Sequence, residues 1–160
     1  HHWACRCLIR NRVLRIQMEK SINHNIMFLK KKAVPVTWKN AREEKETKAL
    51  IRDLQDTLKA NHERCVGMAA NMIGVNKAAI IVSVGPFDVV MLNPVIQEKN
   101  DAFETEEGCL SLEGLRPTVR YKEITVEYDT TSFEHKTEKF TGWVAQIIQH
   151  ECDHLKGIII

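Results

Sequence analysis

The segment QIIQHECDHLKG places His150 and His154 four residues apart, with Glu151 directly after the first histidine. In an α-helix, residues i and i+4 project from the same face one turn apart, so both imidazoles can reach one metal ion. Trp143 and Ile147 precede the histidines at spacings of four and three, and all four side chains share one face. The pattern predicts a C-terminal helix that directs a metal-ligating pair at the core, with Glu151 as a candidate acid or base.

Two histidines do not complete a catalytic site of the zinc type, which uses three protein ligands and a water. Six residues follow His154 in this sequence, and apart from Lys156, an unlikely ligand, they offer no metal-binding side chain. We therefore expect the third ligand upstream, where Cys109 stands in ETEEGCLSLEG. Two other interpretations remain open at this point: a core helix whose histidines are only structural, and a buried, unreactive Cys109 thiol.

The rest of the chain predicts an α+β fold. An apolar stripe at spacings of three and four predicts a long N-terminal helix over Thr37–Asn61. Alternation and β-branched residues predict strands over 78–84, 88–98, 122–129 and 135–142. Thr141 and Gly157 are the expected N-cap and stop of the last helix. We expect mostly antiparallel sheets packed around this C-terminal HExxH helix.

Length and composition narrow the class of protein. A chain of 160 residues is long enough for one domain, which we place at 18–160, with 1–17 as a tag or extension. A net charge of +2 favours neither nucleic acid nor an anionic membrane as partner, and no apolar run approaches the ~20 residues of a membrane helix. Five scattered cysteines do not form a disulfide framework, so we expect a reducing cytoplasm.

Three motifs, in order along the chain, resemble those of the peptide deformylase family. EEGCLS and QHECDHLKG are similar to its second and third motifs, and CVGMAANMIG (Cys65–Gly74) answers the first, G-x-G-x-A-A-x-Q. The resemblance covers about residues 26–160. It implies that Cys109, His150 and His154 hold one divalent metal ion. In the family this is Fe²⁺ in the cell, with Zn²⁺, Ni²⁺ or Co²⁺ accepted, and the ligand set alone does not select one.

The resemblance also implies a function. The expected reaction is metal-dependent removal of the N-formyl group from formylmethionyl nascent peptides, with release of formate, in a bacterial cytoplasm and with the ribosome as a candidate location. Glu151 is the implied acid/base, and the backbone N–H of Leu110 is an implied oxyanion donor. Gln146 is more polar than the aliphatic residue expected at its position. The implied substrate contacts are Val66, Gly67, Glu107, Arg116, Trp143, Gln146 and Ile147.

The sequence departs from the family in its first motif. Cys65 replaces the first glycine, and Met72 replaces the glutamine that donates to the oxyanion. The methionine side chain has no N–H, and loss of one oxyanion donor costs about 2.7–4 kcal/mol of transition-state stabilisation.

Several interpretations follow from Met72. In the first, the chain is a slow deformylase in which water or Asn71 supplies the donor. In the second, it is a weakened or inactive paralogue that binds metal and formyl-peptide. In the third, the residue at position 72 was altered. A zincin-like endopeptidase and a structural zinc site are further alternatives, disfavoured by the missing downstream ligand and by Glu151 beside the ligand pair.

Overall fold

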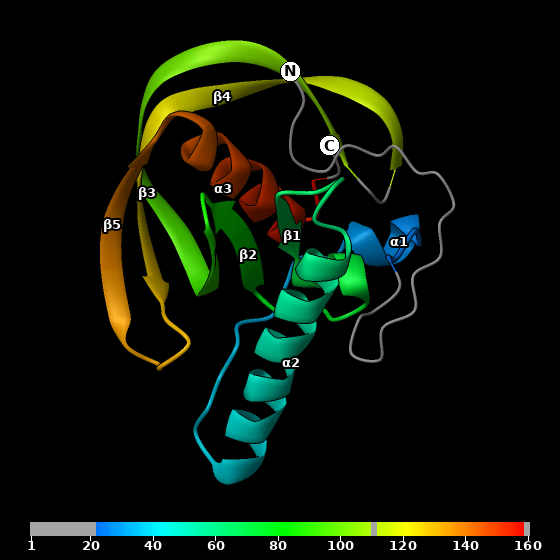
Figure 1. Ribbon diagram of the computed structural model, residues 1–160, viewed down its shortest axis with the longest axis vertical. Coiled ribbons are helices and arrows are strands. Elements are labelled where there is room, and N and C mark those ends of the chain that lie inside the picture. Colours follow the sequence, from blue (N-terminus) through cyan, green and yellow to red (C-terminus); the bar gives the residue numbers. More distant parts are fainter. Residues whose placement is uncertain (1–21, 110–111, 159–160) are drawn as a thin grey trace.

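The computed structural model describes residues 22–109 and 112–158, without the side chains of residues 109, 112 and 113 (Figure 1). The predicted extension at 1–17 and the predicted backbone donor Leu110 lie outside the described residues. The elements follow in the order α1 (Ile26–Leu29), α2 (Ala41–Ala60), β1 (Gly67–Ala69), the 3₁₀ helix η1 (Ala70–Ile73), β2 (Ala79–Val84), β3 (Phe87–Cys109), β4 (Leu112–Asp129), β5 (His135–Thr141) and α3 (Gly142–Leu155). This is the expected α+β arrangement.

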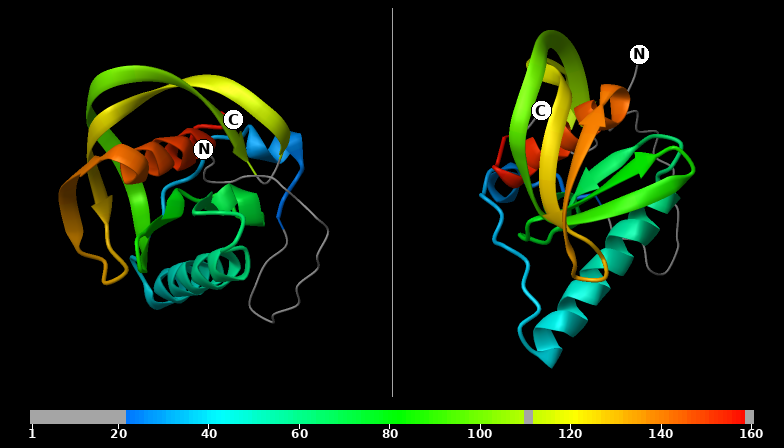
Figure 2. Two further views of the ribbon diagram at one scale, coloured as in Figure 1. Left: turned by 45° about the horizontal axis from the view of Figure 1, so that its top comes forward. Right: turned by 90° about the vertical axis from the view of Figure 1, so that its left-hand side faces the viewer.

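The five strands form one antiparallel sheet in the order β1-β2-β3-β4-β5. Gly85, at φ +77°, makes the two-residue turn between β2 and β3. Register shifts interrupt the pairing of β3 with β4 at three places, and such irregularities bend a sheet. The two long strands consequently arch over α3, while β1 and β2 lie between α3 and α2 (Figures 1 and 2).

The long helix is the second helix of the described chain, because the first, α1, has only four residues. The prediction of a long N-terminal helix is wrong in this respect. Within the predicted range 37–61, α2 begins at Ala41, because the extended Asn40 accepts a hydrogen bond from the Glu43 N–H at 2.9 Å. The predicted apolar stripe is buried: Leu50, Ile51, Leu54 and Leu58.

Helix α3 lies where the sequence predicts it. Thr141 is the extended N-cap residue, although its side chain makes no capping hydrogen bond. Gly157, at φ +83°, ends the helix, and a Cβ there would run into the carbonyl of Lys30. Trp143 is 43% exposed while Ile147 is fully buried, so the predicted inward face does not extend to the first turn. No helix within the described residues is both long and apolar enough to cross a membrane.

Candidate metal centre

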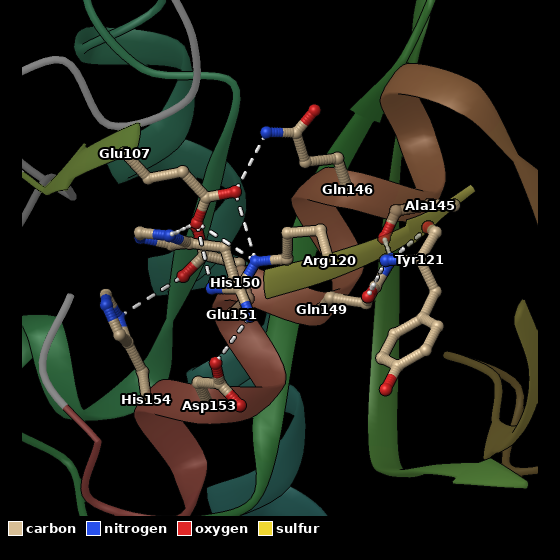
Figure 3. A network of polar contacts seen from close by, with 10 residues as sticks. All are labelled: Glu107, Arg120, Tyr121, Ala145, Gln146, Gln149, His150, Glu151, Asp153 and His154. Carbon is tan, nitrogen blue, oxygen red and sulfur yellow. Dashed lines mark hydrogen bonds and ion pairs between the residues drawn. The ribbon is translucent and has the colours of Figure 1, made fainter. Parts of the chain in front are cut away.

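His150, Glu151 and His154 form a compact buried group on α3. One ligand atom from each lies within 4.8 Å of the others. The two imidazole rings are 4.6 Å apart at 58°, and His154 Nδ1 is 3.4 Å from Glu151 Oε1. The i, i+4 spacing therefore brings the predicted ligand pair together, as Figure 3 shows. Two imidazoles and a carboxylate, shielded from bulk water, form a donor set that fits a transition-metal ion.

The predicted third ligand lies at the end of β3. The main chain of Cys109 pairs with Leu112, two residues beyond Glu107, whose carboxylate contacts His150. The strand thus leads residue 109 toward the same region as the histidines. The Cys109 side chain and Leu110 lie outside the described residues, so their roles as ligand and oxyanion donor stay predictions.

Glu107 orients His150. Its Oε1 lies 2.8 Å from His150 Nδ1, and neither side chain is exposed. Burial opposes ionisation of this carboxyl, but hydrogen bonds from His150 and Arg120 outweigh it and lower the pKa of Glu107 below its ordinary value. An ionised carboxylate only accepts hydrogen bonds, so Nδ1 of His150 carries the proton and Nε2 is the nitrogen suited to a metal. The structure thus gives Glu107 a clear contact with His150, and its implied contact with substrate stays a prediction.

Arg120 links Glu107 to α3, and the sequence did not predict this contact. Its Nη2 donates to Glu107 Oε1 at 2.8 Å, and its Nη1 donates to Asp153 Oδ2 at 2.7 Å (Figure 3). Arg120 is only 4% exposed. Burial alone would lower the pKa of its guanidinium, but hydrogen bonding to Glu107 outweighs this and raises it. A signal existed: Arg120 occupies the inward face of β4, on which Ile124 and Val126 lie.

A second pair of hydrogen bonds fixes α3 to β4. The side-chain oxygen of Gln149 accepts from the Tyr121 N–H at 2.8 Å, and its amide nitrogen donates to the Tyr121 carbonyl at 2.7 Å. The same nitrogen contacts the Ala145 carbonyl at 3.0 Å. Gln149 therefore acts like an additional strand partner for β4 and sets the position of the helix one residue before His150 (Figure 3).

Gly67 allows β1 to approach α3 closely. A Cβ at this position would lie 2.6 Å from Cγ2 of Ile147 and 3.0 Å from Oε2 of Glu151. A residue with a side chain would therefore displace Ile147, Glu151 or the strand itself. The structure brings Gly67, Ile147 and Glu151 together. Val66, which directly precedes Gly67, is half-buried.

Met72 is fully buried in η1, and its side chain has no N–H to donate. Its sulfur lies 3.5 Å from the Ala69 N–H, which it accepts. The neighbouring Asn71 donates through Nδ2 to main-chain carbonyls, that of His154 at 2.9 Å and that of Leu29 at 3.5 Å. The donor groups of Asn71 are therefore already engaged in holding the end of α3, which removes the support for Asn71 as a replacement oxyanion donor.

The remaining implied substrate residues fall into two places. Trp143 and Gln146 line a cavity of about 530 Å³, which lies within the ~300–1,000 Å³ typical of ligand pockets. Its other lining residues are Asp101, Phe103, Lys122, Glu123, Thr141 and Gly142. Arg116 is paired with Glu107 in the β3–β4 register, and among the described residues its buried Nη1 has no hydrogen-bond partner.

Cys65 in the first motif and Cys152 in the third motif are both buried. Cys152 belongs to the apolar core, and burial raises the pKa of its thiol to about 12, so it packs as a small hydrophobic residue. Cys65 is also in the core, and its thiol donates to the Gly67 carbonyl at 2.6 Å. Both side chains are thus part of the packed interior.

Comparisons with known proteins identify what the chain is similar to. The family model described as polypeptide deformylase matches residues 18–160. A peptide deformylase of Clostridium beijerinckii is 50% identical over 143 residues, covering 89% of this chain and all of the relative. The crystal structure of a Thermotoga maritima peptide deformylase superimposes with a TM-score of 0.76 at 33% identity, covering 88% of this chain and 94% of that one. The crystal structure of a Met-Ala-Ser-bound peptide deformylase of Acinetobacter baumannii gives a TM-score of 0.76 at 31% identity, covering 88% of this chain and 96% of that one.

Proposed function

The chain belongs to the polypeptide deformylase family and is a metal-dependent hydrolase with peptide deformylase activity, and from that premise we propose which of its side chains perform each task. The observation that carries the proposal is the buried His150–Glu151–His154 group, with His150 held by Glu107.

We assign the metal to His150, His154 and Cys109. When bound, a divalent ion supplies Lewis-acid activation of a water for attack on the formyl carbon. His150 and His154 project together from α3, and Glu107 presents His150 in the tautomer that ligation requires. A thiolate with two imidazoles suits Fe²⁺, our preferred ion in the cell, and also suits Zn²⁺, Ni²⁺ or Co²⁺.

Glu151 is the proposed acid/base. It is fully buried one residue after His150 and faces Gly67, where its Oε2 is close enough to meet a Cβ. From there its carboxylate takes up the proton released by the attacking water and passes it to the amine that leaves. The amine then departs as the new N-terminus of the peptide, and formate is the second product.

Oxyanion stabilisation is the weaker part of this site. We assign one donor to the backbone N–H of Leu110. The side chain at position 72 would supply the second donor, but the Met72 side chain has no N–H. Its sulfur instead accepts a hydrogen bond from the Ala69 N–H. We therefore propose a slow deformylase, in which water takes the place of the missing donor. A weakened or inactive paralogue that binds metal and formyl-peptide is the second candidate, and Met72 is the observation that favours it.

The proposed substrates are N-formylmethionyl peptides, met in a bacterial cytoplasm and with the ribosome as the candidate place of encounter. Val66, Gly67 and Arg116 are assigned to the peptide chain. Trp143, Gln146 and Ile147 are assigned to the methionine side chain. The cavity that Trp143 and Gln146 line supports the assignment of these two residues. We also propose that 18–160 form one domain and that 1–17 are an extension of it.

Formate release from formyl-Met-Ala-Ser under anaerobic conditions with Fe²⁺ tests the assignment. The chain should release formate, and Glu151→Ala should lower kcat by about 10²–10⁴-fold while it still binds metal. Metal content of both proteins is measured in parallel. Formate release no faster than that of the Glu151→Ala protein, with full metal content, would favour the paralogue that only binds.

A further inference from the structure

A half-buried glutamine joins the candidate substrate pocket to a metal-ligating histidine. Gln146 lines the cavity of about 530 Å³ together with Trp143 and Phe103. Its Nε2 donates to Oε2 of Glu107 at 2.8 Å, and Oε1 of the same carboxylate lies 2.8 Å from His150 Nδ1. Figure 3 shows Glu107 between Gln146 and His150. The wall of the pocket and the imidazole are thus two hydrogen bonds apart.

Gln146 distinguishes the two oxygens of the Glu107 carboxylate. Oε1 accepts from His150 and from Arg120 Nη2 at 2.8 Å, while Oε2 accepts from Gln146. Nε of Arg120 is shared between both oxygens, at 3.1 and 3.0 Å. The last torsion of a glutamate is broad and about two-fold, so a shared donor restrains it weakly. Gln146 is therefore the contact that opposes rotation of the carboxylate on the side away from His150.

We propose that Gln146 is a positioning residue that couples occupancy of this pocket to the orientation of His150. This inference rests on the proposed function, in which the pocket takes the side chain of the formylated residue. A substrate side chain in the pocket confines the Gln146 side chain. Less conformational entropy is then lost when Gln146 is ordered against Glu107, so the bound substrate favours this hydrogen bond. Binding energy from the pocket is thereby expressed in turnover rather than in substrate affinity. An aliphatic residue, as expected here from the family, cannot donate to Glu107.

The matched variants are Gln146→Met and Gln97→Met. Methionine is close to glutamine in length and shape but has no N–H. Gln97 makes the same kind of bond, from Nε2 to a carboxylate oxygen of Glu127 at 2.9 Å, on the exposed part of the sheet. Any effect of losing a glutamine–glutamate bond in general therefore appears in both variants. An effect on the site appears only in Gln146→Met.

Steady-state kinetics on formyl-Met-Ala-Ser and formyl-Ala-Ala-Ser test the coupling as a cycle of one protein change and one substrate change. With formyl-Met-Ala-Ser, Gln146→Met should lower kcat about tenfold and change KM less than about twofold. With formyl-Ala-Ala-Ser, which leaves the pocket largely empty, kcat should change less than about twofold. Gln97→Met should change neither. Equal loss on both substrates, or a change in KM alone, would overturn the proposal.

Co²⁺ binding tests the same residue without turnover. The visible absorption of bound Co²⁺ reports the geometry of its ligands, so filling the pocket with the product Met-Ala-Ser should shift the spectrum of the unsubstituted chain and leave that of Gln146→Met almost unchanged. Gln97→Met should match the unsubstituted chain. If the chain lacks deformylase activity, the proposed function fails while the spectra still decide this inference. An equal response of both proteins to Met-Ala-Ser, including no shift in either, overturns it, and Gln146→Ile replaces Gln146→Met if the latter does not fold.

Discussion

The two sides of α3 are constructed on different principles. On the β3–β4 side, the helix is held by charged and amide groups, with Arg120 between the carboxylates of Glu107 and Asp153. On the β1–η1 side, it is held mainly by close packing, with Gly67 against Ile147 and a fully buried Met72, and by one amide hydrogen bond, from Asn71 to the His154 carbonyl. The first side depends mostly on specific donors and acceptors, and the second depends mostly on shape.

This difference separates two properties that a metallohydrolase usually combines. The polar side orients His150, so in the proposed site it sets how the metal is held. The apolar side faces Glu151 and carries Met72 where the family resemblance predicts a side-chain N–H donor, so in the proposed site it sets the stabilisation of the transition state. Changes on the polar side should therefore alter metal affinity and stability, and changes on the apolar side should alter turnover with the metal retained.

The largest expected effect is on the polar side. Arg120→Met leaves the Glu107 carboxylate buried without its cationic partner, which should lower the free energy of unfolding by about 3–5 kcal/mol. For a chain of this size the Tm should fall by about 10 °C in thermal unfolding. The metal affinity, measured by Co²⁺ titration, should fall about 10–100-fold.

Two further variants sharpen this result. Glu107→Met combined with Arg120→Met removes both buried charges, so the Tm should recover while the Co²⁺ affinity does not, because His150 stays without its carboxylate. Arg42→Met breaks an exposed ion pair with Glu46 and should leave the Tm unchanged. If Arg120→Met is no more damaging than Arg42→Met, the contrast between a polar and an apolar side is wrong.

The next effect is on the apolar side. Met72→Gln introduces the missing donor and should raise kcat on formyl-Met-Ala-Ser, with a ceiling of about 10²–10³-fold that corresponds to about 2.7–4 kcal/mol. Co²⁺ affinity should not change. Met72→Leu is the control, because it changes the side chain without adding an N–H. A rise in kcat for Met72→Leu as well would assign the effect to packing in η1 rather than to the oxyanion.

A smaller effect is expected where β1 meets α3. Gly67→Ala places a Cβ against Ile147 and Glu151, and overpacking of this kind costs about 1–3 kcal/mol. The kcat should fall about tenfold, because displacement of Glu151 misaligns the proton transfer. Adding Ile147→Ala removes the methyl group in closest contact and should restore part of the kcat. Full activity in Gly67→Ala would show that this side tolerates changes of shape.

The elements that the sequence predicts well are those with one buried face. The stripe of α2, the alternation that buries Ile124 and Val126 in β4, and the i, i+4 pair of α3 are all repeats that burial imposes. The α3 boundaries follow from Thr141 and Gly157. Local periodicity therefore predicts these segments and the meeting of His150 with His154.

The parts that were not predicted depend on pairings between distant segments. β3 continues well past the predicted 88–98, through 99–106, where most side chains are exposed on both faces and no apolar period exists. Arg120 meets Glu107 and Asp153 only because the β3–β4 register and the position of α3 bring them together. A charged residue on the inward face of β4 is a signal in the sequence, but its partners lie 13 and 33 residues away.

The smallest expected effect is at the exposed start of β5, where His135 repeats the histidine–carboxylate contact without burial. Its Nδ1 lies 2.9 Å from Asp129, and hydrogen bonds with Asp129 and Glu127 raise the pKa of His135 in the folded chain. A raised pKa means that the protonated form stabilises the fold. This contribution is complete below the unfolded pKa of about 6.5 and is lost as the pH rises through the folded value.

His135→Ala should therefore lower the Tm slightly at pH 5.5 and not at pH 8.5, as measured by thermal unfolding at low salt, where exposed charges are least screened. His62→Ala, at the exposed end of α2, is the control for loss of a surface histidine. The pH-dependent part should remain far below the loss in Arg120→Met, because solvent already stabilises the separated charges of an exposed pair. A loss at pH 5.5 as large as that of Arg120→Met would show that burial is not what makes the Glu107 contacts important.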